Sequence, residues 1–120
     1  MLILLAMCSL MVRPQSIVAV EPPIPPKVLT VKESIVHFAH VYKVPPDKML
    51  AVSKCESGYN PKAVGDGGRA RNIFQFHKPT WDSFTKKMGE ELDYNSYHDQ
   101  SKVASWAFSN GYASHWTCKG

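Results

Sequence analysis

A proline-rich segment at residues 21–26 (EPPIPP) divides this 120-residue chain into two unequal parts. Prolines at this density favour a stiff, extended linker and cannot continue a helix. The segment follows an apolar run and precedes about 90 residues of mixed composition, which is enough for one small domain. We therefore expect residues 1–20 to be a leader, residues 21–29 a linker and residues 30–120 a single folded domain.

The apolar run at residues 1–12 (MLILLAMCSLMV) has the length of a secretory signal core. A membrane-spanning helix needs roughly 20 apolar residues, so the run is too short to span a bilayer. Small residues near Ala19 provide a cleavage site, although no basic residue precedes the run. The alternatives are lipidation at Cys8 and an ordinary buried segment. The run predicts a secreted or cell-envelope protein with no stable membrane span once the leader is removed.

The net charge of +4 favours a polyanionic partner without identifying it. The 14 lysines and arginines are scattered, and no zinc-finger or RNA-binding signature lies among them, so we expect no nucleic-acid binding. Neither a phosphate-binding loop nor a serine or cysteine nucleophile motif occurs. His37 and His40 have the helical spacing of two metal ligands, but no third ligand stands nearby. The sequence therefore predicts neither a metal nor a cofactor.

Four segments combine apolar residues at helical spacing with start and stop signals. We expect helices from the capping box at Thr30 to the break at Pro45, from the cap Asp47 to Gly58, after the cap Thr80, and over residues 101–110. Glycine, asparagine and proline between residues 58 and 72 predict a loop with room for one short hairpin. The fold class is therefore mainly α, as a small helical domain with a glycine-rich loop.

Glu56 stands at the end of the second predicted helix, beside the glycine-rich loop and near aromatic residues. Burial of a carboxyl in such a place raises its pKa and makes it a general acid, as glycosidic bond cleavage requires. The pattern alone is weak, because most helical glutamates are solvated surface residues. Asp66 is the nearest second carboxylate for a hydrolytic mechanism, but its setting in Asp-Gly-Gly favours a turn former.

Cys8 lies in the leader, which leaves Cys55 and Cys118 as a pair that brackets most of the domain. A disulfide is favoured if the protein is exported. Two buried, reduced thiols are the alternative, and a cytosolic protein would favour them.

Several short sequence motifs, taken in order, resemble those of known families. The motifs CESGYNP (residues 55–61), AVG (63–65) and IFQF (73–76) are similar in order and spacing to those of the soluble lytic transglycosylases. The motifs CESG, TWDSF (80–84) and GYASHWTC (111–118) also resemble those of the resuscitation-promoting factor domain. The resemblance covers about residues 30–118 and implies a lysozyme-like fold.

The resemblance implies a bacterial enzyme that binds peptidoglycan glycan strands. We expect the protein to be a monomer. Its reaction would be cleavage of the β-1,4 bond between N-acetylmuramic acid (MurNAc) and N-acetylglucosamine (GlcNAc), with 1,6-anhydro-MurNAc ends as products. One glutamate is enough for this reaction, and Glu56 matches it. The resemblance also implies a Cys55–Cys118 disulfide.

Five further residues are implied to position the acid or contact the substrate. They are Ser57, Asn72, Gln75, Phe76 and Asn110. Asn72 replaces the glycine usual in transglycosylases, and Phe108 replaces a tyrosine, with the neighbouring asparagine shifted to position 110. Core packing is favoured for Phe76 and for Trp81, Trp106 and Trp116. A helix stop is the alternative to a substrate contact for Asn110.

Three other functions are compatible with the sequence. A lysozyme-type muramidase would hydrolyse the same bond, and a catalytically inactive module would bind peptidoglycan without cleaving it. A cytosolic helical interaction protein is the third, and in that case the Cys-Glu-Ser-Gly motif would match those families by chance. Muramic acid with a free reducing end distinguishes the hydrolase from the transglycosylase.

Overall fold

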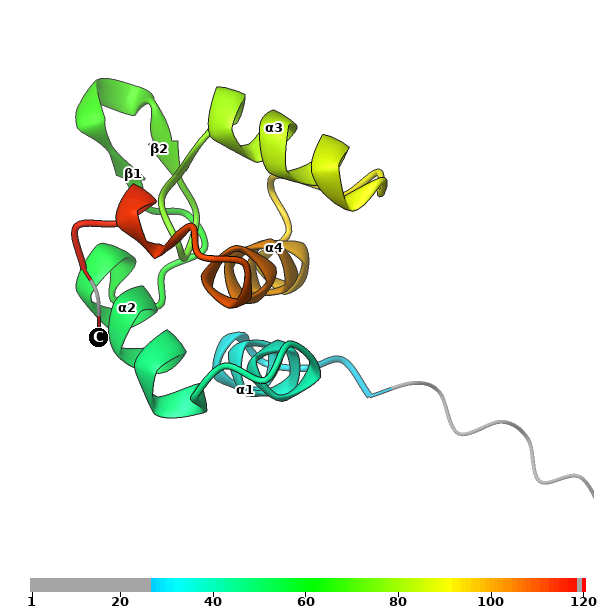
Figure 1. Ribbon diagram of the computed structural model, residues 1–120. Helices are drawn as coiled ribbons and strands as arrows, with labels where there is room; N and C mark the ends of the chain where they lie inside the picture. The colour runs from blue at the N-terminus through cyan, green and yellow to red at the C-terminus, as the bar shows by residue number, and fades with distance from the viewer. Residues whose placement is uncertain (1–26, 119) are drawn as a thin grey trace, which may run out of the picture.

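Four α-helices and a three-stranded antiparallel sheet form the part of the chain that the structure, a computed structural model, describes: residues 27–118 and residue 120 (Figure 1). In chain order the elements are α1 (Val31–Val41), α2 (Pro46–Ser57), β1 (Val64–Gly65), β2 (Ala70–Arg71), β3 (Phe76–His77), α3 (Lys78–Met88) and α4 (Tyr97–Ser109), with 3-10 turns at Asp66–Gly68 and Ala113–His115. The predicted leader and most of the predicted linker lie outside the described residues. Within residues 27–118, no helix has the length and apolar character needed to cross a membrane.

The predicted mainly helical fold is confirmed, and the first helix begins where its capping box placed it. The Thr30 hydroxyl accepts the Glu33 backbone N–H, and the Glu33 carboxylate accepts the Thr30 N–H. These bonds satisfy two backbone donors at the start of α1 that no helical carbonyl reaches. Lys27 adds an ion pair to Glu33, and these contacts together lower the pKa of Glu33 to about 2.

The starts of the other three helices differ from the prediction. Helix α2 begins at Pro46, because a proline at the first position has no N–H to leave unsatisfied; Asp47 therefore lies in the first turn and is not the cap. Helix α3 begins at Lys78, before the predicted cap Thr80, with Pro79 in its first turn.

Helix α4 begins at Tyr97, four residues before the predicted start at 101. Its cap is Ser96, whose hydroxyl accepts the Asp99 N–H. The Tyr97 hydroxyl then donates to the Leu29 carbonyl at 2.6 Å, which ties the start of α4 to the segment before α1.

The loop for which the sequence left room for a short hairpin contains one, formed by β1 and β2, with Val64 opposite Arg71 and Gly65 opposite Ala70. Strand β3 extends the sheet on the other side of β2. No pattern in the sequence indicated β3, because two residues are too few to show alternation. Cross-strand partners share one face of a sheet, so Gly65, Ala70 and His77 form one row.

The core lies between the helices and the sheet, with α4 packed between α1 and α3 (Figure 1). Its aromatic part surrounds Phe76, whose ring makes edge contacts with Trp81, Phe84 and Trp116. Trp81 and Trp116 are buried, as their core interpretation predicted, whereas Trp106 is half-buried. The Trp116 indole N–H also donates to the Phe74 carbonyl at 2.8 Å, which holds the C-terminal tail against the core.

Candidate active site

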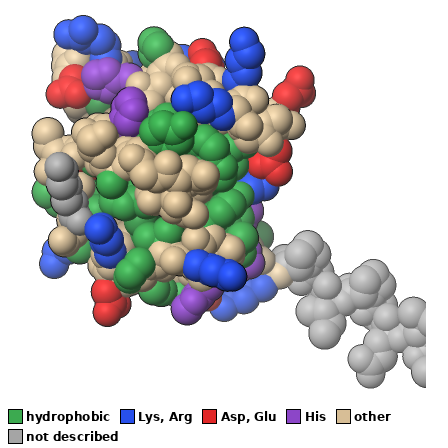
Figure 2. Space-filling model, viewed as in Figure 1, with side chains coloured by type: hydrophobic (Ala, Val, Ile, Leu, Met, Phe, Trp, Pro, Cys, Tyr) green, Lys and Arg blue, Asp and Glu red, His purple; other side chains and the backbone are tan. Residues whose placement is uncertain are grey.

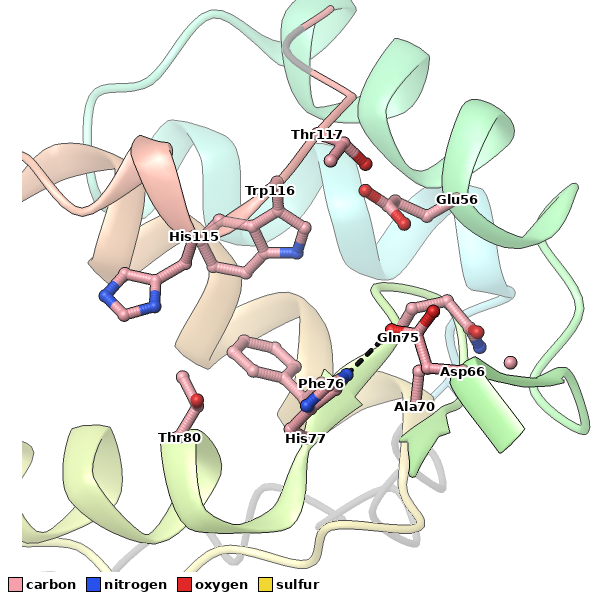
Figure 3. Close-up of a pocket in the computed structure, with 11 residues that line it drawn as sticks. Glu56, Asp66, Ala70, Gln75, Phe76, His77, Thr80, His115, Trp116 and Thr117 are labelled. Carbon is pink, nitrogen blue, oxygen red and sulfur yellow. Dashed lines mark hydrogen bonds and ion pairs between the residues drawn. The ribbon is translucent and has the colours of Figure 1, made fainter. Parts of the chain in front are cut away.

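A cavity of about 520 Å³ opens between the end of α2, the hairpin, the start of α3 and the C-terminal tail. Figure 3 shows Glu56 facing this cavity, with Trp116 and Thr117 on one side and Gln75 and Asp66 on another. We call this cavity the cleft. Its lining residues are Glu56, Gly65, Asp66, Ala70, Gln75, Phe76, His77, Thr80, His115, Trp116 and Thr117.

The Glu56 carboxyl is half-buried at the end of α2, where Gly58 ends the helix in the left-handed conformation with φ of 60°. Burial, which disfavours the charged form, raises the pKa of Glu56, and the negative charge of Asp66 acts in the same direction. The Cys118 N–H donates to Glu56 Oε1 at 3.4 Å and opposes the rise. Glu56 can therefore hold a proton at a pH at which an ordinary glutamate is ionised.

Asp66 and His77 form a pair across the cleft wall, with Asp66 Oδ2 2.8 Å from His77 Nε2 (Figure 3). Asp66 begins the 3-10 turn at the hairpin tip and has a φ of 48°. It is a turn residue, as the sequence favoured, and its carboxylate also lines the cleft that contains Glu56. Two carboxyls thus share the cleft, and one of them is bound to a histidine.

The Gln75 side chain is fixed through its nitrogen. Nε2 donates to the Ala63 carbonyl at 3.1 Å and to the Asn72 carbonyl at 2.9 Å. Since both amide hydrogens are used, the side chain presents Oε1, an acceptor only. A Cβ atom on Gly65 would lie 2.5 Å from this oxygen, so the space for it depends on glycine at position 65.

Asn72 has a φ of 69°, the left-handed conformation that asparagine adopts more readily than most residues. Its side chain is buried, with Oδ1 accepting the Ile73 N–H at 2.8 Å and Nδ2 donating to the Tyr94 carbonyl at 3.4 Å. It does not line the cleft. Asparagine in place of glycine therefore keeps the turn and does not narrow the cleft.

Ser57 acts on the backbone beneath the cleft. Its hydroxyl oxygen lies 2.8 Å from the Ile73 carbonyl and 3.1 Å from the Ser53 carbonyl. Ser53 Oγ donates to the same Ile73 carbonyl at 3.0 Å. The two serines join the end of α2 to the segment that carries Gln75, and Ser57 is not among the residues that line the cleft.

Of the two remaining predicted contacts, Phe76 lines the cleft and Asn110 does not. The Phe76 side chain is 2% exposed, so it offers a substrate little surface and serves mainly the core. Asn110 follows the last residue of α4, and its Nδ2 donates to the Trp106 carbonyl at 2.8 Å. This is the helix stop that was the alternative interpretation of Asn110.

A disulfide joins Cys55 to Cys118 across 63 positions of sequence, with the two Cα atoms 6.0 Å apart. It connects the residue before Glu56 to the tail that carries His115, Trp116 and Thr117. The cleft wall formed by the tail is therefore covalently attached to the helix that positions Glu56.

The cleft also contains residues that the sequence did not assign to it. These are Gly65, Ala70, His77, Thr80, His115 and Thr117. Strand pairing brings Gly65, Ala70 and His77 into one row, and strands of two residues are too short to be predicted from sequence. Only the predicted Cys55–Cys118 pairing would have placed His115 and Thr117 near Glu56. His37 and His40 are both exposed on α1 and do not line the cleft, and no group of three metal-ligating residues occurs among the described residues.

Comparison with known proteins gives one family. Residues 33–109, more than half of the chain, match the family model described as "Transglycosylase SLT domain". No curated protein and no solved structure matches significantly. The match includes the end of α2, the hairpin and β3, and it ends before the tail and Cys118.

Proposed function

Because the chain belongs to the transglycosylase SLT domain family, a lysozyme-like family, we propose that it is a lytic transglycosylase that cleaves the MurNAc–GlcNAc β-1,4 bond with Glu56 as its one catalytic acid. The observation that carries the proposal is the half-buried Glu56 carboxyl with a raised pKa at the wall of a cleft. No other glutamate lines this cleft.

In the proposed reaction, protonated Glu56 donates its proton to the bridging oxygen while positive charge develops on the MurNAc ring. The bond from the anomeric carbon to that oxygen breaks, and GlcNAc leaves with a new hydroxyl. The Glu56 carboxylate then accepts the proton of the MurNAc 6-hydroxyl, whose oxygen bonds to the anomeric carbon. The product is a 1,6-anhydro ring, and Glu56 is protonated again.

The fixed amide of Gln75 supports the same function. Its Oε1 accepts a hydrogen bond from a sugar hydroxyl or N–H, and its two backbone bonds hold that oxygen in place before substrate binds. Because the side chain is already fixed, less conformational entropy is lost when the substrate binds.

Asp66 is the observation that favours the second candidate function, a hydrolytic muramidase. A carboxylate in the same cleft as the acid would activate water as a general base. We place it second because His77 holds the Asp66 carboxylate at 2.8 Å, which removes one of its acceptor sites from a water.

The products of digestion distinguish the two reactions. We expect purified peptidoglycan incubated with the protein to release muropeptides with 1,6-anhydro-MurNAc ends, measured by mass spectrometry. Products heavier by one water, with reducing MurNAc ends, would identify a muramidase instead. Binding to peptidoglycan without any release of muropeptides would identify the inactive module.

Substitution of Gly65 by alanine tests the role of Gln75. The new Cβ would meet Gln75 Oε1 at 2.5 Å, so the amide must move and lose one of its backbone bonds. We expect kcat/KM to fall by about 10- to 100-fold, because small displacements of substrate-positioning groups have effects of this size. The control is Val64→Ala, which trims an exposed side chain of the neighbouring residue in β1 that does not line the cleft. Equal kcat/KM values for wild type and Gly65→Ala would remove Gln75 from the proposed site.

We also propose that the protein works in the bacterial cell envelope or outside the cell. The disulfide supports this location, because disulfides persist in oxidising compartments and are rare in the cytosol. Fractionation of cells that express the tagged chain would test it, and a purely cytosolic protein would contradict it.

A further inference from the structure

A second cavity, of about 560 Å³, lies beside the hairpin, and two arginines and a lysine are among the residues that line it. We call it the arginine groove; its lining residues are Gly68, Arg69, Arg71, His77, Lys78, Pro79, Tyr94 and Asn95. Ala70 faces the cleft, and side chains alternate along a strand, so Arg71 lies on the opposite face of β2. Arg69, which precedes β2, lines the same groove. The cleft and the arginine groove are therefore on two sides of the same hairpin.

The two arginines are held in place and their charges are free. Arg69 Nε donates to the Asp66 carbonyl at 3.3 Å, and Arg71 Nε donates to the Gly68 carbonyl at 3.0 Å. Among the described residues, neither guanidinium forms an ion pair. Each side chain is thus fixed at Nε, while its terminal nitrogens are left to bind an anion.

The third cation of the groove is already neutralised. Lys78 Nζ lies 2.6 Å from Asp82 Oδ1, and its ammonium also lies 5.7 Å from the centre of the Tyr94 ring. The groove therefore has two free positive charges, close together in sequence and on one side of the hairpin. Pro79 and Tyr94 add apolar surface beside these charges.

The groove and the cleft meet at His77, which lines both cavities. A substrate bound in the cleft can consequently send a branch past His77 toward the arginines. The N-terminus of α3, at Lys78 and Pro79, also borders the groove and adds the partial positive charge of a helix start. Basic side chains also stand out on the face of the molecule that Figure 2 shows, without gathering into a continuous stripe there.

We propose that the arginine groove binds the free carboxylates of the peptide stems that MurNAc residues carry. This inference rests on the proposed function, because it takes peptidoglycan as the ligand of the cleft. A stem is attached to the sugar itself, so a MurNAc bound beside Glu56 holds its peptide near the groove. Planar guanidinium groups pair with carboxylates through two hydrogen bonds, and the alanine side chains of a stem suit the surface of Pro79 and Tyr94.

A short acidic peptide fits the groove better than a long polyanion does. A polyanion is bound by a stripe of cations, whereas only two free cations occur here, in a cavity of limited volume. The two arginines instead match the small number of carboxylates on one stem.

The test measures binding directly, by calorimetric titration of the protein with a soluble muramoyl stem peptide that has free carboxylates. We expect Arg69→Gln/Arg71→Gln to weaken binding by about 10-fold or more, since each charged hydrogen bond that is lost is a strong one. The control Lys43→Gln/Lys86→Gln removes two exposed positive charges outside the groove and should leave binding unchanged. Converting the carboxylates of the peptide to amides should reproduce the loss with the unaltered protein.

Cleavage provides the second readout. The Arg69→Gln/Arg71→Gln protein should cleave intact peptidoglycan more slowly than wild type, yet cleave glycan strands stripped of peptides at the wild-type rate. Equal binding of the acid and amide peptides, or equal binding by the variant and wild type, would overturn the inference. So would inorganic polyphosphate that binds more tightly than the stem peptide and displaces it.

The failures of the two proposals are distinguishable. Arginine-dependent binding of the peptide in a protein that cleaves nothing would refute the transglycosylase and leave the groove in place. If wild type and the arginine variant cleaved intact and stripped glycans at equal rates, the transglycosylase would stand and the peptide-binding role of the groove would be refuted.

Discussion

Replacement of Glu56 by glutamine should lower the rate of muropeptide release by about 10²–10⁴-fold, the usual contribution of a positioned acid or base. Glutamine has nearly the same shape as glutamic acid but has no acidic proton to transfer to the bridging oxygen. Its Oε1 can still accept the Cys118 N–H that contacts Glu56 in the wild type. The loss should therefore appear in kcat, while glycan binding and the fold persist.

The pH profile of the wild type follows from the same carboxyl. Glu56 must be protonated to act as the acid, so activity falls as pH rises through its pKa. Burial raises that pKa, which moves the falling limb to a higher pH than an ordinary glutamate would give. The sign for stability is the same: the protonated form is favoured in the folded protein, so the carboxylate destabilises the fold as pH rises. Glu56→Gln should remove this dependence and leave the protein at least as stable near neutral pH.

A matched control is Glu91→Gln, which changes an exposed carboxylate in the segment between α3 and α4, away from the cleft. Its rate of muropeptide release and its pH profile should equal those of the wild type. Retention of most activity by Glu56→Gln would move the catalytic acid elsewhere, and Asp66 would be the next carboxyl to test.

Local signals in the sequence predicted much of the fold because they act over a few residues. The capping box at Thr30 and the stop at Gly58 are satisfied by neighbours within one helical turn, and the structure has both. The start of α4 was predicted four residues too late because its apolar face begins after Ser96 and Tyr97. Its first turn is fixed partly by the bond from Tyr97 to Leu29, 68 positions away in sequence, which no local pattern reveals.

The site was less predictable because it is assembled from distant segments. The sequence indicated that Glu56 ends a helix, but its burial depends on a tail that begins more than fifty residues later. The IFQF motif indicated Gln75 as a site residue, but it did not show that both amide hydrogens donate to backbone carbonyls. The charge pattern was interpreted as scattered, and it is the cavity beside the hairpin that shows Arg69 and Arg71 lining one groove.

Loss of the Cys55–Cys118 disulfide is expected to lower the free energy of unfolding more than any of the substitutions in the cleft or the arginine groove. The bond closes a loop that spans 63 positions, and the chain-entropy model gives ~4 kcal/mol for a loop of that length. For a domain of this size, such a loss lowers Tm by about 15–30 °C. Thermal unfolding of wild type and of Cys55→Ser/Cys118→Ser would measure the difference.

Activity should fall for a second reason, which is local to the cleft. Without the disulfide, the tail is held to the core mainly by Trp116, through its buried ring and its hydrogen bond to Phe74. The Cys118 N–H would then leave Glu56, and the wall formed by His115 and Thr117 would open. Opening exposes the Glu56 carboxyl to water. Because burial is the largest cause of its raised pKa, that pKa should fall toward the ordinary value even though the Cys118 bond, which lowers it, is also lost, and the falling limb of the pH profile should move to lower pH.

Reduction of the wild type separates these two effects from those of the serine substitutions. A reducing agent should lower the Tm of the wild type to that of Cys55→Ser/Cys118→Ser and should leave the double variant unchanged. At a temperature where both remain folded, the double variant should release muropeptides more slowly and lose activity at a lower pH than the wild type. An unchanged pH profile with a lowered Tm would show that the disulfide stabilises the fold without shaping the surroundings of Glu56, and that burial by α2 and the hairpin alone raises the pKa.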